Sequence, residues 1–95
     1  MAKKSEWNGK PAYEEGPLVL QLQDEGWVVI HAKTGWNIMG FKPFKQKKDA
    51  VRYAKNLINK MQLEFSNAEE MFALNGGKEK AEELRTQAFW EGKDE

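Results

Sequence analysis

Apolar and polar residues alternate in the first half of the chain in a way that predicts an antiparallel sheet. In Leu18–Gln23, leucine occupies every second position, which is the period of a strand. The apolar, β-branched run 27–32 predicts a second strand, and residues 36–41 predict a third. Pro43 ends this third strand, because proline cannot donate a backbone hydrogen bond to a neighbour.

The two breaks between these strands share one pattern, a Gly followed by Trp27 in the first and by Trp36 in the second. Glycine takes a positive φ without a Cβ clash, and this favours three-residue hairpin loops. That loop length pairs Gln23 with Trp27 and Ala32 with Trp36. We therefore expect a three-stranded meander in which Leu20 lies beside Ile30.

This register sorts the side chains onto two faces, since directly paired residues share a face. One face is expected to be apolar throughout, with Leu18, Leu20, Leu22, Val28, Ile30, Ala32, Trp36, Ile38 and Gly40. The other is expected to be mixed, with Val19, Gln21, Gln23, Trp27, Val29, His31, Asn37, Met39 and Phe41.

The second half of the chain has helical spacing. Residues 47–61 carry apolar side chains three and four positions apart, which predicts an amphipathic helix lying across the apolar face of the sheet. A capping-box pattern at Ser66–Glu69 predicts the start of a second helix, and Gly76 its end. Residues 78–90 predict a third. The expected fold is α+β, a three-stranded antiparallel meander with one amphipathic helix packed on one face and two shorter C-terminal helices. Residues 1–16 are expected to form an irregular arm, 17–90 a single domain and 91–95 a solvated tail.

Composition removes several classes of protein. The 95 residues include no cysteine, which excludes disulfides and thiolate metal sites. No apolar run approaches the ~20 residues that span a bilayer, and no apolar segment follows the N-terminal lysines. We therefore expect a cytoplasmic protein that does not contact a membrane.

The net charge of zero hides a segregated pattern. Residues 1–30 carry 3 basic and 5 acidic side chains, residues 31–60 carry 8 and 1, and residues 61–95 carry 4 and 9. Such an acid–base–acid order says more about possible partners than the overall charge does.

No catalytic or metal-binding pattern is present in the sequence. His31 is the only histidine and has no cysteine or second histidine beside it, so we interpret it as an ordinary histidine on the surface of the sheet. The paired glutamates, such as Glu82 and Glu83, are adjacent on helices and do not face each other across a cleft. We expect no enzyme activity, no catalytic residue, no metal and no cofactor.

The mixed face is the first candidate binding surface, because tryptophan and methionine beside polar groups are common at protein interfaces. Its residues would be Trp27, Val29, His31, Met39 and Phe41. The purely structural interpretation is that the arm or a C-terminal helix covers this face. We expect a small non-enzymatic interaction module that binds another protein, either by self-association as a homo-oligomer or as an inhibitor or adaptor.

The basic segment 41–55 supports an alternative, the binding of single-stranded nucleic acid. Such binding needs cations that follow the backbone and aromatic rings that stack on bases. The candidate residues are Lys42, Lys45, Lys47, Lys48, Arg52, Lys55, Phe44 and Tyr53. The bland interpretation is a solvated helix face, and zero net charge is unusual for a dedicated nucleic-acid binder.

Overall fold

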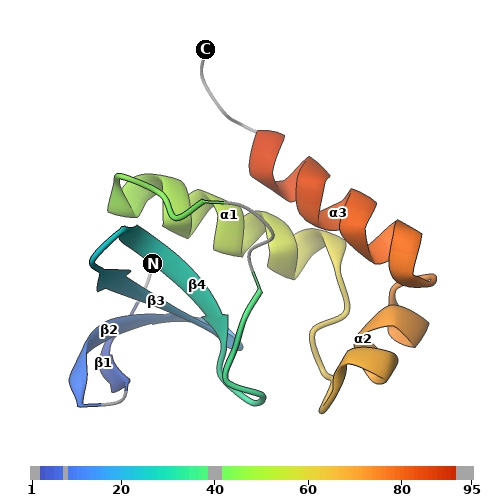
Figure 1. Ribbon diagram of the computed structural model, residues 1–95, viewed down its shortest axis with the longest axis horizontal. Helices are drawn as coiled ribbons and strands as arrows, with labels where there is room; N and C mark the ends of the chain where they lie inside the picture. Colours follow the sequence, from blue (N-terminus) through green and yellow to red (C-terminus); the bar gives the residue numbers. More distant parts are fainter. Residues whose placement is uncertain (1–2, 8, 39–41, 92–95) are drawn as a thin grey trace.

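The protein folds as a five-stranded antiparallel sheet followed by three helices (Figure 1). This computed structural model describes residues 3–7, 9–38 and 42–91. The strands follow one another in the order β1-β2-β3-β4-β5. The elements are β1 (Lys3–Trp7), β2 (Lys10–Glu15), β3 (Leu18–Gln23), β4 (Gly26–His31), β5 (Trp36–Asn37), α1 (Lys47–Lys60), α2 (Ala68–Leu74) and α3 (Lys78–Trp90).

The α+β class, the antiparallel sheet and the three helices are confirmed, but the sheet has five strands instead of three. The prediction that residues 1–16 are irregular was wrong, because they supply β1 and β2. These two strands form a hairpin in which Trp7 pairs with Lys10 and Lys3 with Glu14. The hairpin is rich in charged residues, and its apolar residues show little alternation. The sequence therefore gives little indication that these residues form strands.

The predicted register of β3 and β4 was also wrong, by one residue. Leu20 pairs with Val29 and Leu18 with His31, so the first loop has two residues, Asp24 and Glu25. A one-residue shift moves every side chain of a strand to the opposite face. Val29 and His31 therefore share a face with the leucines of β3.

Gly26 shows why the loop was misjudged. Its φ is +136°, but the stronger constraint is a close approach: a Cβ at this position would lie 2.5 Å from the carbonyl oxygen of Phe44. The backbones of Trp27 and Phe44 exchange two hydrogen bonds, with N···O distances of 2.6 and 2.9 Å. Glycine is thus required where one chain segment presses on another, and not to close a three-residue loop.

The second loop also differs from the prediction by one residue, but it is longer than predicted, whereas the first loop is shorter. His31 pairs with Trp36, so four residues lie between them. The two shifts cancel for β5, and the amide of Ile38 donates to the carbonyl oxygen of Val29. Ile38 therefore lies on the same face as Leu20, as expected, whereas β4 between them is turned over.

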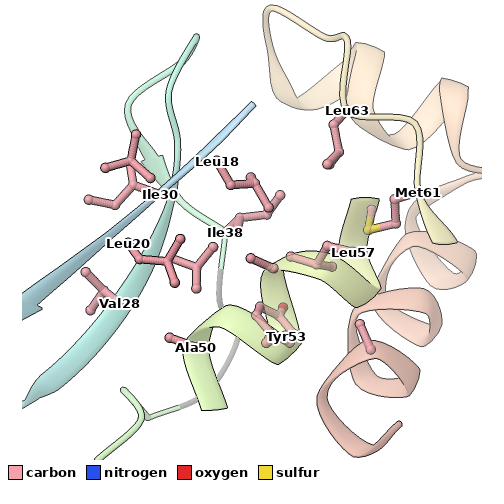
Figure 2. Close-up of a cluster of buried hydrophobic side chains, with 14 of the residues drawn as sticks. Leu18, Leu20, Val28, Ile30, Ile38, Ala50, Tyr53, Leu57, Met61 and Leu63 are labelled. Atoms are coloured by element: carbon pink, nitrogen blue, oxygen red, sulfur yellow. The ribbon is translucent and has the colours of Figure 1, made fainter. Parts of the chain in front are cut away.

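Helix α1 is the central layer of the molecule. It contacts β2, β3 and β4 on one side and α3 on the other. Figure 2 shows Leu18, Leu20 and Ile38 facing Tyr53 and Leu57 of the helix, with Val28 and Ile30 on the opposite side of β4. All of these side chains are buried, and each fully buried one contributes roughly 1.5–3 kcal/mol of transfer free energy.

The second and third helices have the expected bounds within two residues. The N-cap of α2 is Asn67, whose side chain accepts a hydrogen bond from the amide of Glu70 at 2.9 Å. At its other end the amide of Gly77 donates to the carbonyl oxygen of Phe72 at 2.6 Å. This bond between residues five positions apart is typical of a helix that ends at a glycine. Helix α2 thus starts one residue later than the predicted capping box, with Asn67 instead of Ser66 as the N-cap, and it ends just before the predicted Gly76.

The face of the sheet turned away from α1 is covered partly by the sheet itself. Gln21 of β3 donates from Nε2 to the carbonyl oxygen of Trp7 in β1 at 2.9 Å, although β2 lies between these strands in the sheet order. Only Tyr13–Glu15 of β2 pairs with β3. The β1–β2 hairpin therefore curls over this face and makes it concave.

Candidate functional site

The five residues predicted to bind a protein partner do not form one exposed face. Val29 and His31 are fully buried beneath α1 and the segment that follows it. Trp27 is half-buried, with its ring 6.0 Å from that of Tyr13. Met39 and Phe41 lie outside the described residues.

The aromatic residues predicted to stack on nucleic-acid bases belong to the core. Tyr53 is fully buried and Phe44 nearly so, with their rings 5.6 Å apart. Burial raises the pKa of the Tyr53 phenol well above its ordinary value, and the nearby charge of Arg85 offsets part of that rise. Neither ring is accessible to a base.

The basic residues of segment 41–55 divide into three groups. Lys47 lies over the ring of Tyr13, with Nζ 3.4 Å from the ring centroid, and so ties α1 to β2. Lys48 and Lys55 are exposed on α1. Lys42, Lys45 and Arg52 are the cations that line one hollow.

We call this hollow the basic corner. It has a volume of about 490 Å³ and lies where the segment before α1 meets α1 and α3. Among the residues that the structure describes, its charged side chains are Lys42, Lys45 and Arg52 and one carboxylate, Asp49. Three cations in one concave surface make a local excess of positive charge that the net charge of the chain conceals.

The aromatic wall of the basic corner comes from α3. Phe89 lines the hollow, and its ring stacks on that of Phe44 at 5.7 Å with an angle of 16° between the planes. Trp90 contacts Phe89 edge-on at 5.0 Å and is 56% exposed. Aromatic surface is thus present beside the cations, but on residues that the sequence analysis did not select.

Contacts to α3 hold Arg52 in place. Its Nη2 donates to the carbonyl oxygen of Phe89 at 3.4 Å, and its side chain is half-buried. Its Nε is buried and has no hydrogen-bond partner within the described part of the chain. An oriented guanidinium at the wall of a hollow suits an anionic oxygen, because its fork of N–H donors is planar and permanently charged.

A second, larger hollow adjoins the first. It has a volume of about 990 Å³ and lies in the concave face of the sheet, where Gln21, Val28 and Asn37 point away from α1. We call it the sheet hollow. Lys42 and Pro43 line both hollows, so the two meet at this dipeptide.

The sequence contained a signal for part of this arrangement. Tyr53 follows Ala50 by three positions and precedes Leu57 by four, so the helical spacing already places its ring on the buried stripe. Phe89 follows Ala88, which is one of the buried residues of α3. No local pattern indicates that Phe89 reaches the basic segment, because that proximity depends on how α3 packs on α1.

Within residues 3–7, 9–38 and 42–91, no group of three or more His, Cys, Asp or Glu side chains is arranged to hold a metal ion. None of the helices described above is long and apolar enough to cross a membrane.

Comparison with known proteins gives no relative to which this site can be referred. No family model matches the sequence, and neither the curated proteins nor the solved structures contain a significant match. The site is therefore interpreted from its own geometry and charge.

Proposed function

We propose that the protein is a non-enzymatic module that binds single-stranded nucleic acid through the basic corner. The observation that carries the proposal is the gathering of Lys42, Lys45 and Arg52 around one hollow that also contains the ring of Phe89. Cations that neutralise phosphates, combined with aromatic rings beside them, are the two requirements for binding a single strand.

The charge of the corner favours a phosphate backbone as the ligand. Counted over the described lining residues, three cations and one carboxylate give a local charge of about +2. The acidic residues of the C-terminal third, such as Glu79, Glu82 and Glu83, do not line this hollow. Salt screens exposed charges beyond about 8 Å at physiological ionic strength, so the local excess is what a ligand encounters at contact.

The aromatic part of the proposal differs from the sequence-based one. The ring proposed to stack on bases is that of Phe89, with the exposed Trp90 beside it, and no longer those of the buried Phe44 and Tyr53. Base–aromatic stacking contributes about 1–3 kcal/mol per base and tolerates any sequence, because every base has a π-face. The module would therefore bind single strands with little preference for base order at this corner.

Binding of a protein partner is less well supported. The face proposed for it depended on Val29 and His31, and both side chains are fully buried. Among the described residues, the large exposed apolar side chains belong to five different elements: they are Leu22 of β3, Trp36 of β5, Ile58 of α1, Leu74 of α2 and Trp90 of α3.

The test removes two cations that line the basic corner. In Lys42→Gln/Lys45→Gln, affinity for a fluorescent oligothymidylate should fall, and the slope of log Kobs against log salt should become shallower by about 1.4, which is 0.7 for each lost phosphate contact on a single strand. The matched control is Lys33→Gln/Lys78→Gln, which removes the same charge from exposed lysines that line neither hollow.

Three outcomes would count against the proposal. These are no binding by the unmodified protein at low salt, equal losses in the two double variants, and an unchanged salt slope. Size-exclusion chromatography with light scattering on the same samples measures the alternative: a dimer, or a complex with an added protein, in the absence of oligonucleotide binding would favour the protein-partner function.

A further inference from the structure

The two hollows differ in the chemistry of their linings, although they meet at Lys42 and Pro43. The basic corner has three cations and one carboxylate. The sheet hollow has two of each, Lys10 and Lys42 against Asp24 and Glu25, and three side-chain amides. One hollow is cationic, and its neighbour is neutral and rich in hydrogen-bonding groups.

We infer that a single strand bound at the basic corner continues across Lys42 and Pro43 into the sheet hollow, where its bases contact the side-chain amides and one phosphate comes near Lys10 at the far side of the hollow. The inference rests on the proposed function and assigns a second site to the same ligand. A neutral surface with side-chain amides has no excess charge to attract phosphates. It offers the donors and acceptors that base edges need.

The amides of the sheet hollow are held in order. Gln21 is buried and donates from Nε2 to the carbonyl oxygen of Trp7 at 2.9 Å. Its Oε1 accepts from Nε2 of Gln23 at 3.4 Å. Gln23 itself is exposed, and its carboxamide still has an acceptor oxygen and a second N–H to offer to a base.

Lys10 marks the far side of the path. It is exposed at the start of β2 and lines the sheet hollow but not the basic corner. A strand that follows both hollows would bring a phosphate near Lys10 only after its bases had entered the sheet hollow. A strand confined to the corner would not reach it. The length of the oligonucleotide therefore separates the two situations.

The experiment compares oligonucleotides of about 4 and about 12 nucleotides, both within the range of roughly 4–16 nucleotides covered by single-strand modules. Lys10→Gln should leave binding of the short strand unchanged. With the long strand it should lower affinity and make the salt slope shallower by about 0.7, the value of one phosphate contact. Gln23→Ala should weaken the long strand by about fivefold, as expected for one net hydrogen bond, without changing the salt slope.

Proteins are compared at a fixed strand length, because a long strand also gains affinity from its greater number of binding positions. Lys33→Gln is the matched control for Lys10→Gln, since it removes an exposed lysine that lines neither hollow. The inference is overturned if Lys10→Gln and Gln23→Ala leave the affinity for both oligonucleotides unchanged. It is also overturned if they lower the affinity for the short and the long oligonucleotide equally. In that case Lys42→Gln/Lys45→Gln still reports on the corner, so the proposed function survives or fails separately. Absence of binding to either strand overturns both.

Discussion

The imidazole of His31 and the backbone carbonyl of Leu63 lie 2.7 Å apart, from Nε2 to the oxygen, and join β4 to the connection between α1 and α2. A carbonyl oxygen only accepts, so Nε2 carries the proton. The other ring nitrogen lies 2.8 Å from the hydroxyl of Thr34, and the ring stacks on Phe65 at 4.0 Å. The only histidine of the chain is thus a structural link between the sheet and the helical half.

Replacement of His31 should destabilise the fold strongly. His31→Ala leaves the Leu63 carbonyl without its hydrogen bond and opens a cavity beside Phe65, so we expect a loss of about 3 kcal/mol, measured by urea denaturation. Thr34→Val removes the hydroxyl contact to His31 together with the longer bond that the hydroxyl accepts from the Trp36 amide at 3.3 Å, and it should cost about 1 kcal/mol. Equal, small effects of both substitutions would contradict the role assigned to the Leu63 bond.

Tyr53 should make the protein sensitive to alkali. Burial raises the pKa of its phenol in the folded state above the ordinary value of 10.0. Above about pH 10 the unfolded chain loses this proton while the folded one keeps it, so the free energy of unfolding falls as pH rises, by at most about 1.4 kcal/mol per pH unit.

Tyr53→Phe isolates this effect, because it removes the phenol hydroxyl and keeps the ring. The difference in unfolding free energy between the unmodified protein and Tyr53→Phe should be constant below about pH 9 and should shift in favour of the variant above about pH 10. A difference that does not vary with pH would mean that the phenol ionises equally in the folded and unfolded chains.

Gly26 should tolerate substitution less well than Gly35. A Cβ at residue 26 would lie 2.5 Å from the Phe44 carbonyl oxygen, whereas nothing lies within 4 Å of one at residue 35. Both glycines have positive φ, +136° and +76°. Gly35→Ala should therefore cost about 1–2 kcal/mol from the backbone conformation alone. Gly26→Ala should cost more, since the Trp27–Phe44 backbone pair must shift.

Thermal or urea unfolding of the two alanine variants measures this difference directly. A Gly26→Ala variant no less stable than Gly35→Ala would show that the segment before α1 moves away from β4 at little cost.

The helices could be predicted from the sequence because their spacing and caps are local. In residues 47–61 the apolar side chains recur every three or four positions, and the structure places α1 at Lys47–Lys60. The register of β4 could not be fixed in the same way. Its run of Val28, Val29 and Ile30 is apolar on both faces, so either orientation of the strand buries apolar side chains.

In the candidate site, too, the local features could be predicted from the sequence and those that depend on tertiary packing could not. The cations Lys42, Lys45 and Arg52 were selected from the sequence, because clustering of charge is visible in it. Their aromatic neighbour Phe89 was not selected, since it lies 37 residues after Arg52 and contacts it only through the packing of α3. The sheet hollow was also missed, because it depends on the curl of a hairpin that the sequence analysis did not expect.

The pair of backbone hydrogen bonds between Trp27 and Phe44 anchors the segment that carries Lys42 and Lys45 to the edge of β4. The two lysines thus stand on either side of a fixed point and are held close to their positions before any ligand arrives. Binding of a ligand at the basic corner and formation of the two hydrogen bonds between Trp27 and Phe44 are then coupled equilibria. A bound polyanion would slow the exchange of the Trp27 and Phe44 amide protons with solvent by the same factor by which it stabilises the closed state.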